Sequence, residues 1–201
     1  MHPTLVREPF HREGWIYEEK VDGWRIVAYM DGDHVRLVSR NGVDHTRRFG
    51  DIAAAIAKLS ARTLVQGEVA IYDEHLRSRF DWLREPDRNA VATPPLLMVF
   101  DVLFCNGCDV RTRPLRDRRA RLEDVVAGSK LVFPVRRLAP DGVEAWQQVL
   151  ERGYEGYVAK DAASGYAGGP TKRWLKVKQK DWTVEEDRWR RRISMTPSPS
   201  R

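Results

Sequence analysis

The chain carries EEKVDGWR at residues 18–25, a stretch in which one lysine stands among acidic residues. Apolar and aromatic residues border it on both sides, which predicts a short strand before it and a second strand from Trp24 onward. Gly23 marks the turn between the two strands and lets a ligand approach the backbone closely. A lysine near carboxylates is usually half of a surface ion pair, but its place between two strands makes Lys20 a candidate for chemistry.

Lysine is scarce in this chain. Of its 35 basic residues 27 are arginine and eight are lysine, a skew that genome composition explains most simply. Arginine does not deprotonate usefully, so it cannot replace a nucleophilic amine. Five of the eight lysines lie within residues 160–180, which makes that segment a second place to look for chemistry.

A lysine that acts as a nucleophile must be neutral when it attacks. With a pKa near 10.4, only about one free lysine side chain in two thousand is neutral at pH 7. A bound divalent cation and nearby ammonium groups both lower the pKa of an amine. Lys176 and Lys178 are the candidate ammonium groups, because residues two apart on a strand share one face, here with Trp174.

Length and composition predict a globular chain with one large domain or two small ones. The chain has 201 residues, 42% of them hydrophobic and 32% charged, and a net charge of +6. It has no run of about 18 apolar residues that would span a membrane, and its N-terminus lacks the apolar stretch of a secretory signal. Two cysteines cannot form a disulfide framework, so we expect a reducing, cytoplasmic setting.

Apolar patterning predicts strands along most of the chain. They fall over residues 15–20, 24–30, 64–72, 96–104, 154–160 and 173–178. Asp31-Gly32, followed by alternating Val35 and Leu37, predicts a hairpin. Cys105 and Cys108 are spaced like one of the two cysteine pairs of a metal site, but no second pair exists. Asn106-Gly107 between them favours a turn, and we expect no metal cluster. His34, His45 and His75 show no ligand spacing and are expected at the surface.

Helices are predicted over residues 49–59, 114–127 and 141–152. The arginines of the second are expected on a solvated face. The third should start at Asp141 as N-cap, with Glu144 as its reciprocal partner, and stop at Gly153. A basic helix or arm is expected over residues 182–193, and a disordered tail after it. Without an internal repeat, these elements predict an α+β fold with largely antiparallel sheets.

Six short motifs in order give the chain a family resemblance. KVDGWR at residues 20–25 resembles the adenylation motif of the covalent nucleotidyltransferases, which are ATP-dependent DNA ligases, RNA ligases and mRNA capping enzymes. The others resemble the motifs that follow it: SRNG at 39–42, GE at 67–68, VFD at 99–101, EGYVAK at 155–160 and WLKVK at 174–178. One four-residue match arises by chance in roughly one such chain in a thousand, and six in order do not.

The resemblance is closest to bacterial ATP-dependent DNA ligases, including the ligase domains of end-joining enzymes, and covers about residues 5–192. It implies that Lys20 attacks the α-phosphate of ATP and holds AMP through a phosphoramide bond. It also implies that Glu18 contacts the adenine amino group, that Phe100 stacks on adenine and that Glu68 binds the ribose. Phe100 within an apolar run has the alternative of being plain core.

The same resemblance places charged residues around the phosphates. Arg25 and Arg40 would hold the nucleotide and later the nick, and Lys176 and Lys178 would neutralise the phosphates. Glu155, together with Glu68, would bind a divalent metal.

Three further residues have weaker assignments. Asp22 and Lys160 are additional candidates for the site. Lys160 and Glu155 differ in strand parity, so both can face one pocket only if Gly156 forms a bulge. Asp101 has the alternative of being a buried acid with a structural role.

The implied fold is the ATP-grasp-like nucleotidyltransferase fold of the ligase adenylation domain, with mainly antiparallel sheets flanked by helices. The implied cofactors are ATP and Mg²⁺ or Mn²⁺. The implied partner is nicked duplex DNA, which would be sealed in repair and recombination, in association with a bacterial nucleoid. An RNA ligase and a non-catalytic nucleic-acid-binding remnant of a ligase are the alternatives.

The domain boundaries differ from those of the family. We expect an adenylation domain over residues 1–187, then a basic arm and Pro/Ser tail over residues 188–201. Only 23 residues follow Lys178, so the OB-fold domain that usually comes next is expected to be absent. A separate OB-fold or DNA-repair protein would then be a partner, and the arm would contact DNA phosphates through Arg188, Arg190, Arg191 and Arg192.

Overall fold

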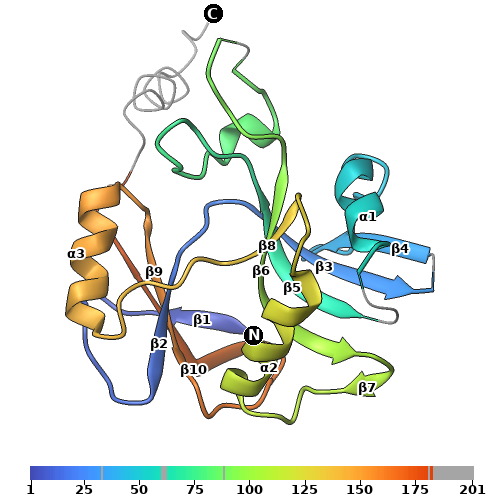
Figure 1. Cartoon of the computed structure of the whole chain (residues 1–201). Helices are drawn as coiled ribbons and strands as arrows, with labels where there is room; N and C mark the ends of the chain where they lie inside the picture. The colour runs from blue at the N-terminus through green and yellow to red at the C-terminus, as the bar shows by residue number, and fades with distance from the viewer. Residues whose placement is uncertain (33, 60–62, 88, 181, 183–201) are drawn as a thin grey trace, which may run out of the picture.

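The computed structural model describes residues 1–32, 34–59, 63–87, 89–180 and 182. Two β-sheets with three helices make up the described part of the chain (Figure 1). The expected basic arm and tail at residues 188–201 lie outside the described residues, as does most of the expected helix at residues 182–193. No helix in the described part is long and apolar enough to cross a membrane.

The first sheet has four strands in the order β1-β10-β9-β2. They are β1 (His2–Leu5), β2 (Trp15–Glu19), β9 (Gly156–Asp161) and β10 (Pro170–Lys178). β9 pairs antiparallel with both β2 and β10, whereas β1 runs parallel to β10. The predicted strands at 15–20, 154–160 and 173–178 are therefore confirmed.

Helix α3 (Gly142–Arg152) packs against this sheet through β2 and β9. The Asp141 carboxylate caps it by accepting hydrogen bonds from the backbone N–H groups of Val143 and Glu144. Gly153 ends it in the left-handed region with φ 66°. The predicted helix, its N-cap and its stop are thus confirmed.

The second sheet runs in the order β4-β3-β5-β6-β7, with β8 added in parallel beside β6. Its strands are β3 (Trp24–Asp31), β4 (His34–Ser39), β5 (Leu64–Ala70), β6 (Leu96–Cys105), β7 (Cys108–Asp109) and β8 (Val132–Pro134). β3 and β4 form the predicted hairpin, and Asn106 and Gly107, with φ of 51° and 79°, form the predicted turn between β6 and β7.

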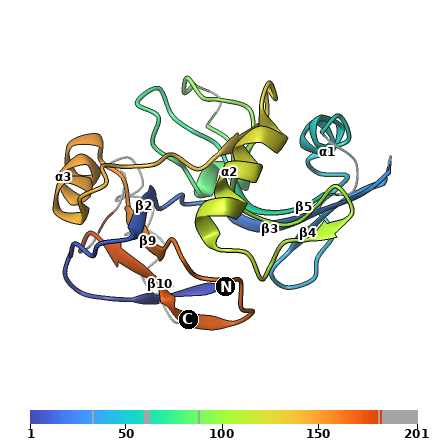
Figure 2. The same ribbon diagram turned by 60° about the horizontal axis from the view of Figure 1, so that its bottom comes forward.

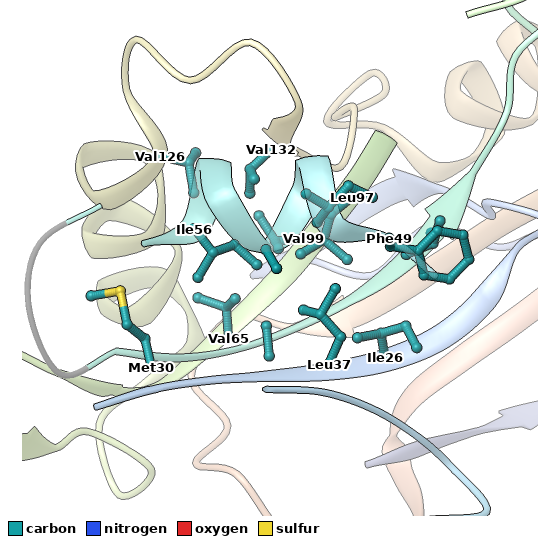
Figure 3. Packing of buried hydrophobic residues seen from close by; sticks show 14 of the residues in the cluster. Ile26, Met30, Leu37, Phe49, Ile56, Val65, Leu97, Val99, Val126 and Val132 are labelled. Carbon is teal, nitrogen blue, oxygen red and sulfur yellow. The ribbon is translucent and has the colours of Figure 1, made fainter. Parts of the chain in front are cut away.

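Two helices complete the second half of the molecule. They are α1 (Gly50–Ile56) and α2 (Leu115–Val126), and Figure 2 shows α1 and α3 at opposite ends of the molecule. Ile56 packs with strand residues such as Leu37 and Val65 (Figure 3). Val126 of α2 and Leu97 of β6 belong to the same cluster, so this core fixes the second sheet beneath both helices.

The α+β class and the largely antiparallel pairing are confirmed, but some expectations are wrong. Strands β1 and β8 and a short 3₁₀ helix, η1 (Asp81–Leu83), were not predicted, because each is only three or four residues long and too short for a period. His45 is half-buried against Trp24 rather than at the surface, with ring centroids 5.3 Å apart.

Helix α2 carries only half of its arginines on a solvated face, because Arg116 and Arg121 are exposed and the other two are buried. The side chains of Arg118 and Arg119 are 0% and 1% exposed. The reason is that α2 packs on β6, and both arginines reach acidic partners beneath it.

Candidate active site

A cavity of about 240 Å³ opens between the two sheets. Every one of the six motifs contributes to its lining, with β2, β9 and β10 of the first sheet on one side and β3, β5 and β6 of the second sheet on the other. The predicted site residues that line it are Glu18, Lys20, Arg25, Arg40, Glu68, Phe100, Lys160 and Lys176. Segments far apart in the sequence are thus brought to one place, as the motifs predicted.

Lys20 follows the last residue of β2. Its backbone N–H donates to the carbonyl oxygen of Gly156 at 3.0 Å, which ties the end of β2 to the start of β9. Gly23 then lets the chain cross to β3, since a Cβ there would lie 2.4 Å from the carbonyl oxygen of Val69. The Lys20 side chain is 18% exposed, so its amine is accessible from the cavity.

Glu155 forms an ion pair with the Lys20 amine. One carboxylate oxygen pairs with Lys20 Nζ, and the other lies 2.5 Å from Lys178 Nζ. The Glu155 side chain is only 8% exposed, so two ammonium groups compensate a nearly buried carboxylate. The predicted neighbourhood of Lys20, Glu155 and Lys178 therefore exists.

The bulge expected at Gly156 is not present. The pairing of β9 with β10 is regular from Gly156, opposite Lys178, to Lys160, opposite Trp174. Glu155 lies just before β9, so strand parity does not apply to it, and both Glu155 and Lys160 reach the site. Gly156 is needed for another reason, because a Cβ there would lie 2.0 Å from the carbonyl oxygen of Val177.

Glu18 and Lys160 form a buried pair at the wall of the cavity. Both side chains are 2% exposed or less. The Nε of Arg119 lies 2.8 Å from the second carboxylate oxygen of Glu18. Burial lowers the pKa of Lys160, and the Glu18 carboxylate opposes that effect. The sequence interpretation missed Arg119, although an arginine on the apolar side of a predicted helix was a signal that it needs a buried acid.

Phe100 serves both the core and the cavity. It packs edge-on against Trp174, with ring centroids 5.8 Å apart, and is 6% exposed. The guanidinium carbon of Arg25 lies 4.5 Å from its ring centroid, at cation–π distance. Its neighbour Asp101 is a buried acid that accepts two hydrogen bonds from Arg118, at 2.8 and 3.0 Å. The structural alternative for Asp101 is therefore the one observed.

Arg25 and Glu68 face each other across paired strands β3 and β5. Arg25 Nη1 lies 3.9 Å from Glu68 Oε1, and Nη2 donates to Gln66 Oε1 at 3.3 Å. Burial raises the pKa of Glu68 to about 7, while the charges of Arg25 and Lys20 lower it in part. Glu68 is thus a carboxyl group that a cation would help to ionise.

Of the remaining candidates that the structure describes, Lys176 and Arg40 line the cavity and Asp22 does not. Lys176 lines the cavity, and burial together with the charges of Lys178 and Lys20 lowers its pKa. Arg40 is exposed but also lines the cavity. Among the described residues Asp22 is not part of the lining, and its backbone N–H donates to Ser78 Oγ at 2.9 Å.

Comparisons with known proteins agree with this arrangement. A family model described as the ATP dependent DNA ligase domain matches residues 4–178. The multifunctional non-homologous end joining protein LigD of Pseudomonas aeruginosa is 34% identical over 179 residues, which cover 87% of this chain and 21% of that protein. A probable DNA ligase of Streptomyces griseus is 34% identical over 178 residues, covering 80% of this chain and 35% of the relative.

Solved structures of similar fold include two ligase structures. The ligase domain of Mycobacterium tuberculosis LigD is 26% identical with a TM-score of 0.74, and a mycobacterial DNA ligase D complexed with ATP is 25% identical with a TM-score of 0.72. Each match covers 88% of this chain and 60% of the solved chain. The chain thus spans about a third or less of the two curated relatives described. With a family model that matches 175 of its 201 residues, the chain belongs to the ATP-dependent DNA ligase domain family.

Proposed function

We propose that this chain forms a covalent lysyl-AMP at Lys20 and uses it to seal 5′-phosphate/3′-hydroxyl nicks in duplex DNA. The observation that carries the proposal is one cavity in which the accessible amine of Lys20 meets side chains of all six motifs. The names of relatives such as the probable DNA ligase of Streptomyces griseus and the DNA ligase of Thermococcus onnurineus support DNA as the substrate.

Three transfers make up the reaction. The lone pair of the neutral Lys20 amine attacks the α-phosphorus of ATP, a P–N bond forms as the nitrogen loses a proton to solvent, the bond to the β-phosphate breaks, and pyrophosphate leaves. A 5′-phosphate oxygen of the nick then attacks the same phosphorus and releases the lysine. Finally the 3′-hydroxyl attacks the 5′-phosphate, loses its proton, and AMP leaves.

The surrounding residues would position the nucleotide and neutralise the charge of its phosphates. Phosphoryl transfer depends mainly on alignment and on charge stabilisation, which cations near the phosphates provide. Arg25, Arg40, Lys176 and Lys178 would take this role. Glu18 and Phe100 would hold the adenine, and Glu68 the ribose. Asp22 and Lys160 are secondary candidates, Lys160 through its pairing with Glu18.

The carboxylates present fit a divalent cation that arrives with ATP. No group of three or more potential protein ligands occurs among the described residues. Mg²⁺ is commonly bound by one or two carboxylates together with substrate phosphates. Glu155 and Glu68 are such a pair of hard oxygen donors, and they would hold the ion. Bound there, Mg²⁺ or Mn²⁺ would supply positive charge to the phosphate oxygens.

The domain over residues 1–187 would carry this chemistry, and the arginines at residues 188–192 would add DNA contacts. Each neutralised phosphate contributes about −0.9 to the slope of log affinity against log salt. Deleting residues 188–201 should therefore leave adduct formation near normal and make the salt dependence of nick binding shallower. Equal slopes for both proteins would contradict a DNA-binding arm.

The decisive experiment follows the covalent adduct. Incubation with ATP labelled at the α-phosphate and Mg²⁺ should give a gel-stable, acid-labile AMP adduct. Lys20→Arg should give none, because arginine keeps the charge without a usable lone pair. The matched control is Lys172→Met, at an exposed lysine of β10 that does not line the cavity. An adduct in Lys20→Arg would overturn the assignment.

The substrate is tested in the same assay. Labelled GTP distinguishes ligase from capping chemistry, and nicked DNA offered beside nicked RNA distinguishes the two ligase classes. A pre-adenylated DNA nick adds a check on the order of steps, since the last step needs no lysine adduct. Lys20→Arg should retain some sealing of that substrate. A wild-type chain that binds DNA without forming any adduct would favour the non-catalytic alternative.

A further inference from the structure

Arg136 contacts both Glu19 and Tyr154, the residues that directly precede Lys20 and Glu155 in the chain. Lys20 and Glu155 are paired, and each is preceded in the chain by a residue that touches the Arg136 guanidinium. Arg136 Nη1 lies 3.1 Å from Glu19 Oε2 and also donates to the hydroxyl of Tyr154. Arg136 belongs to the segment after β8, so a third part of the chain joins the ends of β2 and β9.

The backbone strengthens the same connection. The N–H of Glu19 donates to the carbonyl oxygen of Arg136 at 3.0 Å, and the next N–H, that of Lys20, donates to Gly156 at 3.0 Å. Residue 136 therefore holds residue 19 through both its backbone and its side chain. The guanidinium carbon also lies 5.4 Å from the Tyr154 ring centroid, which adds a cation–π contact.

The Arg136 guanidinium matters here because both of its partners, Glu19 and Tyr154, are buried. The Glu19 side chain is 0% exposed, and neither of its oxygens accepts a hydrogen bond from the described residues. The Arg136 guanidinium, at 3.1 Å, is the direct polar partner of this buried carboxyl group and stabilises its ionised form. Tyr154 is also buried, with 4% exposure. Losing the guanidinium would thus free both residues to shift, and their neighbours Lys20 and Glu155 with them.

We infer that Arg136 is a positioning residue that holds Lys20 at the place from which its amine reacts. The inference rests on the proposed function for its kinetic consequence, since it concerns the lysine proposed to carry AMP. Arg136 is not part of the cavity lining among the described residues, so it acts through Glu19 and Tyr154. Misplacing a reacting group by about 1 Å can slow a reaction by roughly a hundredfold.

The first test separates positioning from binding. Arg136→Met should lower the maximal rate of adduct formation by about tenfold or more, while the KM for ATP changes less than about twofold. Tyr154→Phe removes only the hydroxyl that accepts from Arg136, keeps the ring in its cluster, and should give a smaller loss of the same kind. The double variant should be no slower than Arg136→Met alone, because both changes break one connection. Arg36→Met, at an exposed arginine paired with Asp44, is the control.

The second test does not depend on catalysis. Reductive ¹³C-methylation of the lysines gives an NMR signal for Lys20, which its loss in Lys20→Arg assigns. That signal should move in Arg136→Met and Tyr154→Phe and stay in place in Arg36→Met. An unmoved Lys20 signal, or a normal maximal rate in Arg136→Met, would overturn the inference even if the wild-type chain adenylates. A wild-type chain without adduct would refute the proposed function alone, and the NMR result would still decide the positioning.

Discussion

Replacing Glu19 by glutamine should change how the stability of the protein depends on pH. The carboxyl group is fully buried, and Arg136 Nη1, at 3.1 Å, is its direct cationic partner. Burial raises the pKa of Glu19 from the usual 4.5 to about 7, and the charges of Arg136 and Arg152 lower it only in part. Folding therefore favours the protonated acid, in contrast to a carboxyl group in a hydrogen-bonded salt bridge.

The sign and size of the effect follow from proton binding. Between pH 4.5 and pH 7 the unfolded chain has lost this proton and the folded chain still holds it, so the Glu19 contribution to stability falls as pH rises. One pKa unit corresponds to about 1.4 kcal/mol, which over this interval gives about 3 kcal/mol. Glutamine keeps an acceptor for Arg136 but has no proton to lose. Relative to wild type, Glu19→Gln should therefore gain about 2 to 3 kcal/mol in free energy of unfolding between pH 5 and pH 8.

Urea unfolding at several pH values measures this difference. Glu68, whose pKa is also raised, contributes equally to both proteins, so it cancels in the comparison. Glu8→Gln, at an exposed glutamate, is the matched control and should show the same pH dependence as wild type. Parallel pH curves for wild type and Glu19→Gln would refute the reasoning, because Glu19 would then be ionised across the whole range in the folded protein.

Three further predictions concern the helices and the phosphate side of the cavity. Asp101→Asn leaves the buried Arg118 guanidinium without its carboxylate and should cost about 3 kcal/mol in urea unfolding; a cost under about 1 kcal/mol would contradict the importance of this pair. Asp141→Ala removes the N-cap of α3 and should cost about 1 kcal/mol by thermal or urea unfolding, whereas an unchanged stability would mean that the cap is replaceable. Lys176→Met should slow AMP-adduct formation about a hundredfold, with Lys172→Met as control, and equal rates would remove Lys176 from the phosphate site.

The parts of the fold that were predictable are those in which a single segment carries its own signal. The strand at Leu96–Cys105 is nearly all apolar, and it is a buried interior strand of the second sheet, between β5 and β7. Asp141 and Gly153 define the ends of α3 by local capping chemistry, independent of what the helix packs against. Strands β1 and β8 were missed because a three- or four-residue segment becomes a strand only when a neighbour pairs with it.

The site was predictable for a different reason. Its chemistry needs residue types in fixed order, so short motifs mark the lysine, the carboxylates and the late cations, and the fold then brings them around one cavity. Strand parity failed at Glu155 because the strand begins one residue later, at Gly156. The predicted strand began at residue 154, so Glu155 was assigned a face by an alternation that applies only within the strand.

The partners of the arginines behind the cavity could not be predicted from any pattern. Arg118, Arg119 and Arg136 lie between the motifs, and each meets an acid from a distant segment. The apolar side of α2 indicates that Arg119 needs a buried acid, but no local pattern indicates which acid an arginine meets. The partner of each arginine depends on tertiary packing, that is, on how α2 packs against β6 and how the segment after β8 packs beside β2.

These buried ion pairs also bear on the alternative of a non-catalytic remnant. Removing two charges from water usually costs as much as the pair regains, so apolar residues of similar size are commonly as stable or more stable at such positions. Around this cavity Lys160 pairs with Glu18 and Arg118 pairs with Asp101, and both acidic side chains are 0% or 1% exposed. Binding DNA by surface charge needs neither of them. They hold the acids and lysines of the cavity at fixed positions, which is what the proposed catalysis at Lys20 would need.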